Sequence, residues 1–160
     1  MPRISRLVFA CVAALFPLTA AAGQLPDLSK TPGKWRVLST DRICSIHWGL
    51  DRRHVTPAMK SEVFARYGCT GNNAQCCTPD DHDQFCEIDH LISRELGGDD
   101  VVDNLWPQSY GGNWNARDKD RLENRLHKEV CDGNLALRRA RQMITNDWKA
   151  AYRQYFGNSP

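Results

Sequence analysis

The sequence predicts an α+β domain in which two short strands precede a pair of helices and disulfides hold the chain together. Two β-rich segments, residues 85–92 and 103–106, flank a Gly-Gly-Asp-Asp turn at residues 97–100. Apolar residues then recur at helical spacing from residue 115 onward. Seven cysteines in 160 residues are typical of an exported, disulfide-bonded protein.

The first 22 residues are typical of a secretory signal peptide. Arg3 and Arg6 give a positive start, residues 7–16 form a short apolar core, and Ala20-Ala21-Ala22 offers the small residues that a signal peptidase reads. A membrane anchor would need about 20 apolar residues. We therefore expect cleavage after Ala22, one mature domain at residues 23–160, and a secreted or periplasmic location without membrane attachment.

The charges of the mature chain balance but are unevenly distributed. Removing residues 1–22 leaves equal numbers of basic and acidic residues, so no net charge draws the chain to nucleic acid. Residues 80–103 carry nine carboxylates and only Arg94, whereas residues 115–160 carry ten Lys or Arg against six Asp or Glu. An acidic centre with basic flanks suits a cation-dependent phosphodiesterase, although ordinary surface charge produces the same pattern.

Six cysteines remain once Cys11 is removed with the signal peptide. An even number in an exported chain predicts three disulfides, and about fifteen pairings are possible. Cys76 and Cys77 are adjacent, so we expect them to bond to two different partners. The alternative is a zinc site formed by these two residues with Cys69 and Cys86, but the chain contains no Cys-x-x-Cys pair.

The first half of the mature chain predicts one helix, one loop and two strands. The helix spans residues 57–67, with Thr56 as N-cap and Pro57 in its first turn. The Gly, Asn, Asp, Pro and Cys content of residues 68–84 indicates a disulfide-stapled loop. Residues 85–92 and 103–106 then form the two strands, and Pro107 is expected to end the second.

Two amphipathic helices follow the strands. The first begins near Asn115, repeats Leu122, Leu126 and Val130 on one face, and ends at residues 131–133, where Gly133 suits the left-handed position after a helix. The second presents one apolar face made of Leu137, Ala140, Ile144 and Trp148.

Five polar residues occur where strands and helix are expected to meet. Asp89 and His90 lie in the first strand, Asn104 at the second, and Asn113 and Asn115 at the helix entrance. Phosphodiester hydrolysis needs a base for the attacking water and a cation for the phosphate and the leaving oxygen. A neutral histidine supplies the base near physiological pH. Asp and Asn oxygens suit Mg²⁺ or Mn²⁺ better than zinc.

Several ordered segments carry a family resemblance. They are Glu87-Ile88-Asp89-His90-Leu91-Ile92, Leu96-Gly97-Gly98, Asn104-Leu105-Trp106-Pro107-Gln108, Trp114-Asn115-Ala116, Lys119-Asp120-Arg121-Leu122-Glu123-Asn124, Leu126-His127, Val130-Cys131-Asp132-Gly133 and Asp147-Trp148. Together they resemble the exported bacterial endonucleases of the HNH type, in the His-Asn-Asn variant, which share a ββα-metal (His-Me finger) core. The resemblance covers roughly residues 85–150, with a looser similarity at residues 43–44 and 67–68.

The resemblance implies a ββα-metal core over about residues 85–132, with additional helices. His90 would activate the water, Asp89 would bind the metal, and Asn104 would hold the loop between the strands. A second ligand would come from the helix start. Asn115 is favoured by its Trp-Asn-Ala context and Asn113 by its spacing of nine residues from Asn104. The cofactor implied is one divalent ion, Mg²⁺ or alternatively Mn²⁺, and cleavage would leave a 3′-hydroxyl and a 5′-phosphate.

Structural interpretations of the same residues stay open. Asp89 could cap a turn, His90 could be a half-buried histidine, and whichever of the two asparagines binds no metal would cap the helix. Glu123 could orient a metal-bound water or pair with arginines at the surface.

Cations flank the proposed site and are candidates for phosphate contacts, first of all Arg94, Arg117 and Arg121, with Lys119 and Arg125 beside them. No recognition helix, zinc finger or repeat is apparent, so little sequence preference is expected. We expect an exported, metal-dependent endonuclease acting on DNA, with RNA as an open second substrate and an inhibitor or immunity protein as an open partner. The alternative is a catalytically silent module of the same fold that binds nucleic acid or another polyanion.

Overall fold

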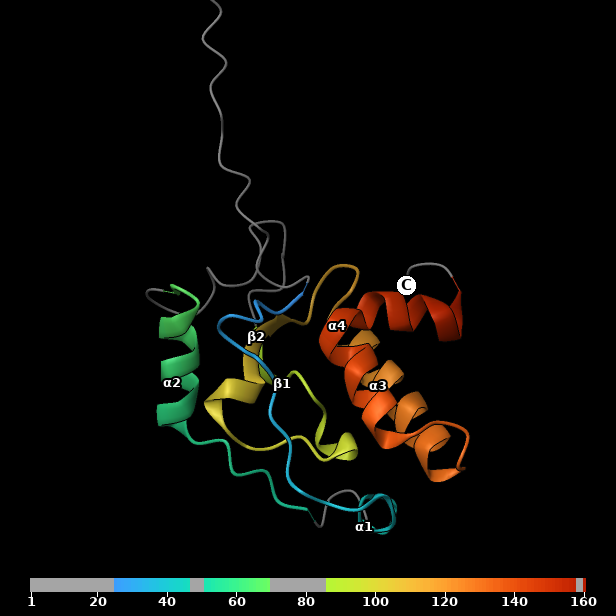
Figure 1. Cartoon of the computed structure of the whole chain (residues 1–160). Helices are drawn as coiled ribbons and strands as arrows, with labels where there is room; N and C mark the ends of the chain where they lie inside the picture. The colour runs from blue at the N-terminus through green and yellow to red at the C-terminus, as the bar shows by residue number, and fades with distance from the viewer. Residues whose placement is uncertain (1–24, 47–50, 70–85, 158–159) are drawn as a thin grey trace, which may run out of the picture.

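A computed structural model describes residues 25–46, 51–69, 86–157 and 160 (Figure 1). The predicted signal peptide and nearly all of the predicted loop at residues 68–84 lie outside these ranges. Among the residues that are described, no helix is both long enough and apolar enough to cross a membrane.

The described chain is a mixture of helices and a small sheet, so the α+β prediction is confirmed at this level. Its elements are, in order, α1 (Thr40–Cys44), α2 (Pro57–Arg66), β1 (Cys86–His90), the 3-10 turns η2 (Arg94–Leu96) and η3 (Val102–Asn104), β2 (Leu105–Ser109), α3 (Ala116–Cys131) and α4 (Leu137–Phe156). Figure 1 shows the β1–β2 hairpin in the middle, with α2 on one side and α3 and α4 on the other.

Local capping explains where the helices begin and end. The Thr56 hydroxyl accepts the backbone N–H of Met59 at 3.2 Å and starts α2. Asn115 starts α3, since its Oδ1 accepts the backbone N–H groups of the second and third helical residues at 2.9 and 3.2 Å. Gly133, at φ 78°, follows the end of α3. These predicted helix boundaries are confirmed.

The two strands form one antiparallel hairpin, in which Asp89 is opposite Trp106 and His90 opposite Leu105. The prediction that Pro107 ends the second strand is wrong, because this residue lies inside β2. Within the described ranges the sheet has only two strands, so each has a free edge at which the missing N–H of a proline needs no partner.

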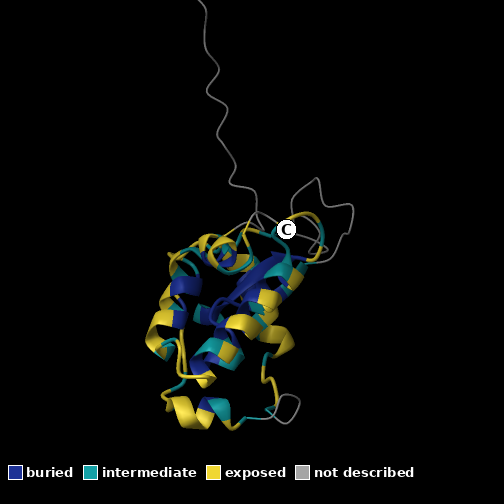
Figure 2. Cartoon of the chain, turned by 90° about the vertical axis from the view of Figure 1, so that its right-hand side faces the viewer, coloured by how far each residue is buried: buried dark blue, intermediate teal, exposed yellow. Residues whose placement is uncertain are grey.

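The main core lies between α3, α4 and the loop that follows β1. Its fully buried members include Leu91, Ile92, Leu96, Trp106, Leu122, Leu126, Ile144 and Trp148. A smaller cluster of Val63, Ile88 and Leu105 joins α2 to the sheet. Figure 2 shows dark-blue buried segments, among them the fully buried β2, behind helices whose outer faces are yellow. The apolar face predicted for α4 is confirmed, but a kink at Asp147 (φ −167°, ψ 93°) was not predicted.

A disulfide connects the N-terminal segment to the core. Cys44 at the end of α1 is bonded to Cys131 at the end of α3, across 87 residues of sequence. Cys69 and Cys86 are also disulfide-bonded, whereas Cys76 and Cys77 lie outside the described residues. The zinc alternative, which required free thiols at residues 69 and 86, is therefore wrong for this oxidised chain.

Candidate active site

His90 is oriented by a carboxylate. It is the last residue of β1 and is almost fully buried, and its Nε2 is 2.7 Å from Oδ1 of Asp100. Because a carboxylate can only accept, Asp100 favours the tautomer with hydrogen on Nε2 and a lone pair on Nδ1. Burial lowers the pKa of His90, although the charges of Asp89 and Asp100 act in the opposite direction. The imidazole is therefore neutral at pH 7 and can accept a proton.

Two arginines and a second aspartate form a row of ion pairs that ends at Asp100. Arg94 is 3.7 Å from Asp100 through Nε and 2.6 Å from Asp51 through Nη2. Asp51 in turn binds Arg36 at 3.3 Å. Burial disfavours the charged form of Asp100, but a backbone N–H and the side chains of His90 and Arg94 outweigh it and lower its pKa. Asp100 is therefore held as a carboxylate in one orientation.

A close backbone approach brings Asp100 to the histidine. Gly98 lies against the segment that leaves β1, and its N–H donates to the carbonyl of Ser93 at 2.8 Å. A Cβ at residue 98 would be 1.7 Å from the carbonyl oxygen of Ile92, so only glycine fits there. The preceding Gly97 has φ 82° and makes the turn. The Gly-Gly pair therefore folds the loop back so that Asp100 reaches His90.

Asn104 ties the two ends of this loop together. It is fully buried, and its Oδ1 accepts the backbone N–H groups of Ile92 at 3.0 Å and Lys34 at 3.3 Å. Its Nδ2 donates to the carbonyls of Ile92 and Asp99 at 3.0 and 3.1 Å. The backbone N–H of Leu91 donates to its carbonyl at 2.7 Å. Asn104 thus ties the start of the loop, at Leu91 and Ile92, to its end, and holds Asp99 next to Asp100.

A buried lysine joins α3 to the end of β1. The Lys119 ammonium is fully buried and donates to Asp89 Oδ2 at 2.7 Å, to the carbonyl of His90 at 2.6 Å and to Glu123. Burial disfavours the charge on Lys119, but Asp89 and Glu123 outweigh it and raise its pKa. Burial likewise disfavours the charge on Asp89, and Lys119 outweighs it, so the pKa of Asp89 is lowered.

One ammonium does not neutralise all the acids around it. Burial raises the pKa of Glu123 well above its ordinary value, and burial raises that of Glu95 to about 7 with a further contribution from Asp120. Asp89, Glu95 and Glu123 line the same cavity, of about 150 Å³, together with His90. Oε2 of Glu95 is buried and has no hydrogen-bond partner among the described residues. The cavity therefore offers three carboxyl groups as oxygen ligands, and the guanidiniums of Arg53 and Arg94 also line it.

The two predicted asparagine ligands lie apart from this cavity. Asn115 uses its Oδ1 to cap α3 and its Nδ2 to donate to Gly112 at 2.8 Å. Asn113 is exposed on the preceding turn. The cavity lining contains neither residue.

The predicted phosphate-binding arginines are dispersed. Arg94 lines the cavity but is paired with Asp51, and Arg117 is exposed at the start of α3. Arg121 packs over Phe156 at 4.2 Å and donates to the Tyr152 hydroxyl at 3.0 Å, on the face of α3 that meets α4. Arg53, which sequence reasoning did not single out, lines the cavity.

Two further residues of the site, Lys119 and Asp100, were not predicted in their observed roles. Lys119 was considered as a phosphate contact, whereas it is fully buried against carboxylates. A signal existed, because residue 119 is in helical phase with the buried Leu122 and Leu126. Asp100 lay in an acidic turn with Asp99 and Asp103 nearby, and no local pattern marked it as the partner of His90.

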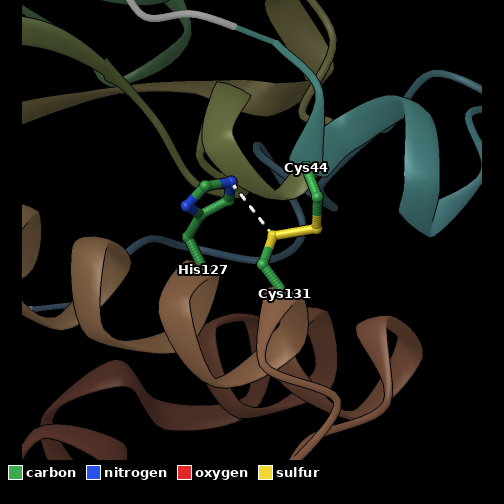
Figure 3. A group of neighbouring side chains, drawn as sticks. All are labelled: Cys44, His127 and Cys131. Atoms are coloured by element: carbon green, nitrogen blue, oxygen red, sulfur yellow. Dashed lines mark hydrogen bonds between the residues drawn. A yellow bond between two sulfur atoms is a disulfide. The ribbon is translucent and has the colours of Figure 1, made fainter.

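Cys44, Cys131 and His127 form a second group of potential metal ligands, with ligand atoms within 4.8 Å of one another. Figure 3 shows the two sulfurs joined as a disulfide, with the imidazole of His127 beside Cys131. The distance from His127 Nε2 to Cys131 Sγ is 3.5 Å. Since zinc needs thiolate sulfurs, this group is a crosslink with a neighbouring histidine in the oxidised chain.

Comparison of the chain with protein-family models, curated proteins and solved structures gives no match in any of the three.

Proposed function

We propose that the chain is an exported, divalent-metal-dependent endonuclease that hydrolyses phosphodiester bonds of nucleic acid with little sequence preference. The observation that carries the proposal is the Asp100–His90 pair beside a cavity lined by three carboxylates. A neutral imidazole next to a cluster of acids matches the two requirements of phosphodiester hydrolysis, a base for water and a site for a cation.

His90 acts as the general base in this proposal. Its Nδ1 accepts the proton of a water molecule that attacks phosphorus, and the bond to the leaving 3′- or 5′-oxygen then breaks. Asp100, 2.7 Å from Nε2, stabilises the imidazolium that results. The HNH resemblance favours a 3′-hydroxyl and a 5′-phosphate as the product ends. Arg53 lines the cavity and supplies a guanidinium for the phosphate.

The residues around the cavity fit a hard divalent cation. Asp89, Glu95 and Glu123 offer oxygen ligands, which suit Mg²⁺ or Mn²⁺, and Glu95 carries a buried oxygen without a partner among the described residues. The proposed ligands are therefore Asp89 with these two glutamates, in place of Asn113 or Asn115. A cation bound there would neutralise charge on the phosphate and on the leaving oxygen.

The experiment is degradation of plasmid and of single-stranded DNA by the mature, oxidised protein with Mg²⁺ and with chelator, beside His90→Ala. We expect cutting only with the metal ion, and a loss of about 10²–10⁴ in rate for His90→Ala, the usual contribution of a general base. His127→Ala is the matched control, because this histidine lies at the Cys44–Cys131 disulfide. Equal activity of His90→Ala and the control would overturn the assignment of the base.

The second candidate function is a catalytically silent binding module, which the exposed cations on α3 also suit. Binding through phosphates survives chelation, whereas hydrolysis does not. Absence of cutting with Mg²⁺ and Mn²⁺ by correctly oxidised protein, together with retained binding, would favour this module.

A further inference from the structure

We infer that a second cavity beside the proposed active site binds the nucleotide next to the scissile phosphate, and that the substrate is therefore single-stranded nucleic acid. The inference rests on the proposed function and names its substrate class. The cavity has a volume of about 380 Å³ and lies between α2 and β1. Its lining includes Arg53, Lys60, Phe64, Glu87 and Tyr110.

Arg53 connects the two cavities, because it lines both. Its Nη2 donates to the carbonyl of Ile88, which holds the guanidinium beside the strand that carries Asp89 and His90. Within the described ranges neither Arg53 nor Lys60 forms an ion pair, whereas Arg94 is paired with Asp51. A guanidinium with open donors between the two cavities is placed to bind the phosphate that joins two nucleotides.

The second cavity has the composition of a single-strand subsite. Tyr110 and Phe64 provide aromatic surface, and Lys60 provides a second cation for the next phosphate. The Tyr110 hydroxyl donates to the Glu87 carboxylate, which fixes the ring at the cavity wall.

The geometry favours a single strand over a duplex. A base can enter a cavity of about 380 Å³ and stack on an aromatic ring only when it leaves its own stack. In a duplex this step costs unpairing and unstacking energy, whereas a single strand offers unpaired bases. Stacking in such a cavity does not require a helix or hairpin placed in a groove to read base edges. This mode of binding is consistent with little sequence preference.

The test measures binding without cleavage. Mature, oxidised protein in chelator is titrated into a short fluorescein-labelled single-stranded DNA, and separately into the same sequence as a duplex, with anisotropy as the readout. We expect tighter binding to the single strand. Tyr110→Ala should weaken it roughly fivefold or more, and Tyr110→Phe should retain it, because stacking needs the ring and not the hydroxyl. Lys60→Ala should reduce the slope of log K against log salt by about 0.7.

Arg138→Ala is the matched control, since it removes an exposed cation from the first turn of α4, outside both cavities. Equal affinity of the control, Tyr110→Ala and Lys60→Ala, or tighter binding of the duplex, overturns the subsite. These outcomes are separable from failure of the proposed function. His90→Ala should bind like the unmodified protein, and a protein that binds as expected but never cuts retains the subsite and loses the nuclease.

Discussion

Replacement of Lys119 by methionine tests the buried ion pairs of the site by a measurement of stability, independently of activity. The ammonium is fully buried and contacts Asp89, Glu123 and the carbonyl of His90. The substitution keeps most of the side-chain volume but leaves two carboxylates buried without a cation. Removal of one partner of a buried ion pair costs about 3–5 kcal/mol of unfolding free energy. That is a large part of the roughly 5–15 kcal/mol that stabilises a typical domain.

The assay is urea unfolding of the oxidised protein at pH 7, followed by tryptophan fluorescence. Lys128→Met is the matched control, because it removes an exposed lysine from the same helix and should cost no more than about 0.5 kcal/mol. The double variant Asp89→Asn/Lys119→Met should be more stable than Lys119→Met alone, since it removes one uncompensated charge. A loss below about 1 kcal/mol for Lys119→Met, or strict additivity in the double variant, would refute the buried ion pair.

The same variant has a defined pH dependence. Lys119 outweighs burial and lowers the pKa of Asp89 in the folded state. The stability that the Asp89–Lys119 pair contributes is therefore fully present above about pH 3.9, the pKa of an aspartate in the unfolded chain. It disappears as the pH falls through the lower pKa of Asp89 in the folded state. The difference in unfolding free energy between the unmodified protein and Lys119→Met should be largest near neutral pH and should narrow below about pH 4. A difference that grows on acidification would contradict the pairing.

Three further variants test the loop and the crosslink. Removing the disulfide with Cys44→Ala/Cys131→Ala, which closes 87 residues, should lower the unfolding free energy by about 2–4 kcal/mol in calorimetry; an unchanged Tm would contradict this. Asn104→Ala leaves several buried backbone groups unpaired and should cost about 2–4 kcal/mol in urea unfolding, while the exposed Asn124→Ala should be nearly neutral. Gly98→Ala forces a Cβ into a carbonyl oxygen and should reduce both stability and cleavage rate; full activity would show that the loop can shift.

Local sequence determined α2, α3, α4 and the two strands, with most of the helix ends, whereas α1 and the two 3-10 turns were not predicted. Thr56 and Asn115 cap α2 and α3 with their own side chains, so a few neighbouring residues suffice to place each helix start. The apolar stripe of α3 follows from helical periodicity alone. Pro107 was misjudged, because the rule that a proline ends a strand assumes neighbours on both edges, and β2 has only one within the described part of the chain.

Tertiary structure alone decided the partners within the site. Asp100 reaches His90 because a Gly-Gly turn folds the loop back, and the acidic turn offers Asp99 and Asp103 as equal candidates in sequence. Lys119 meets Asp89 across 30 residues of chain, a pairing set by how α3 crosses the end of the hairpin. The physical reason is range: caps and periodicity act over a few residues, whereas charge pairs depend on distances that exist only once the core has packed.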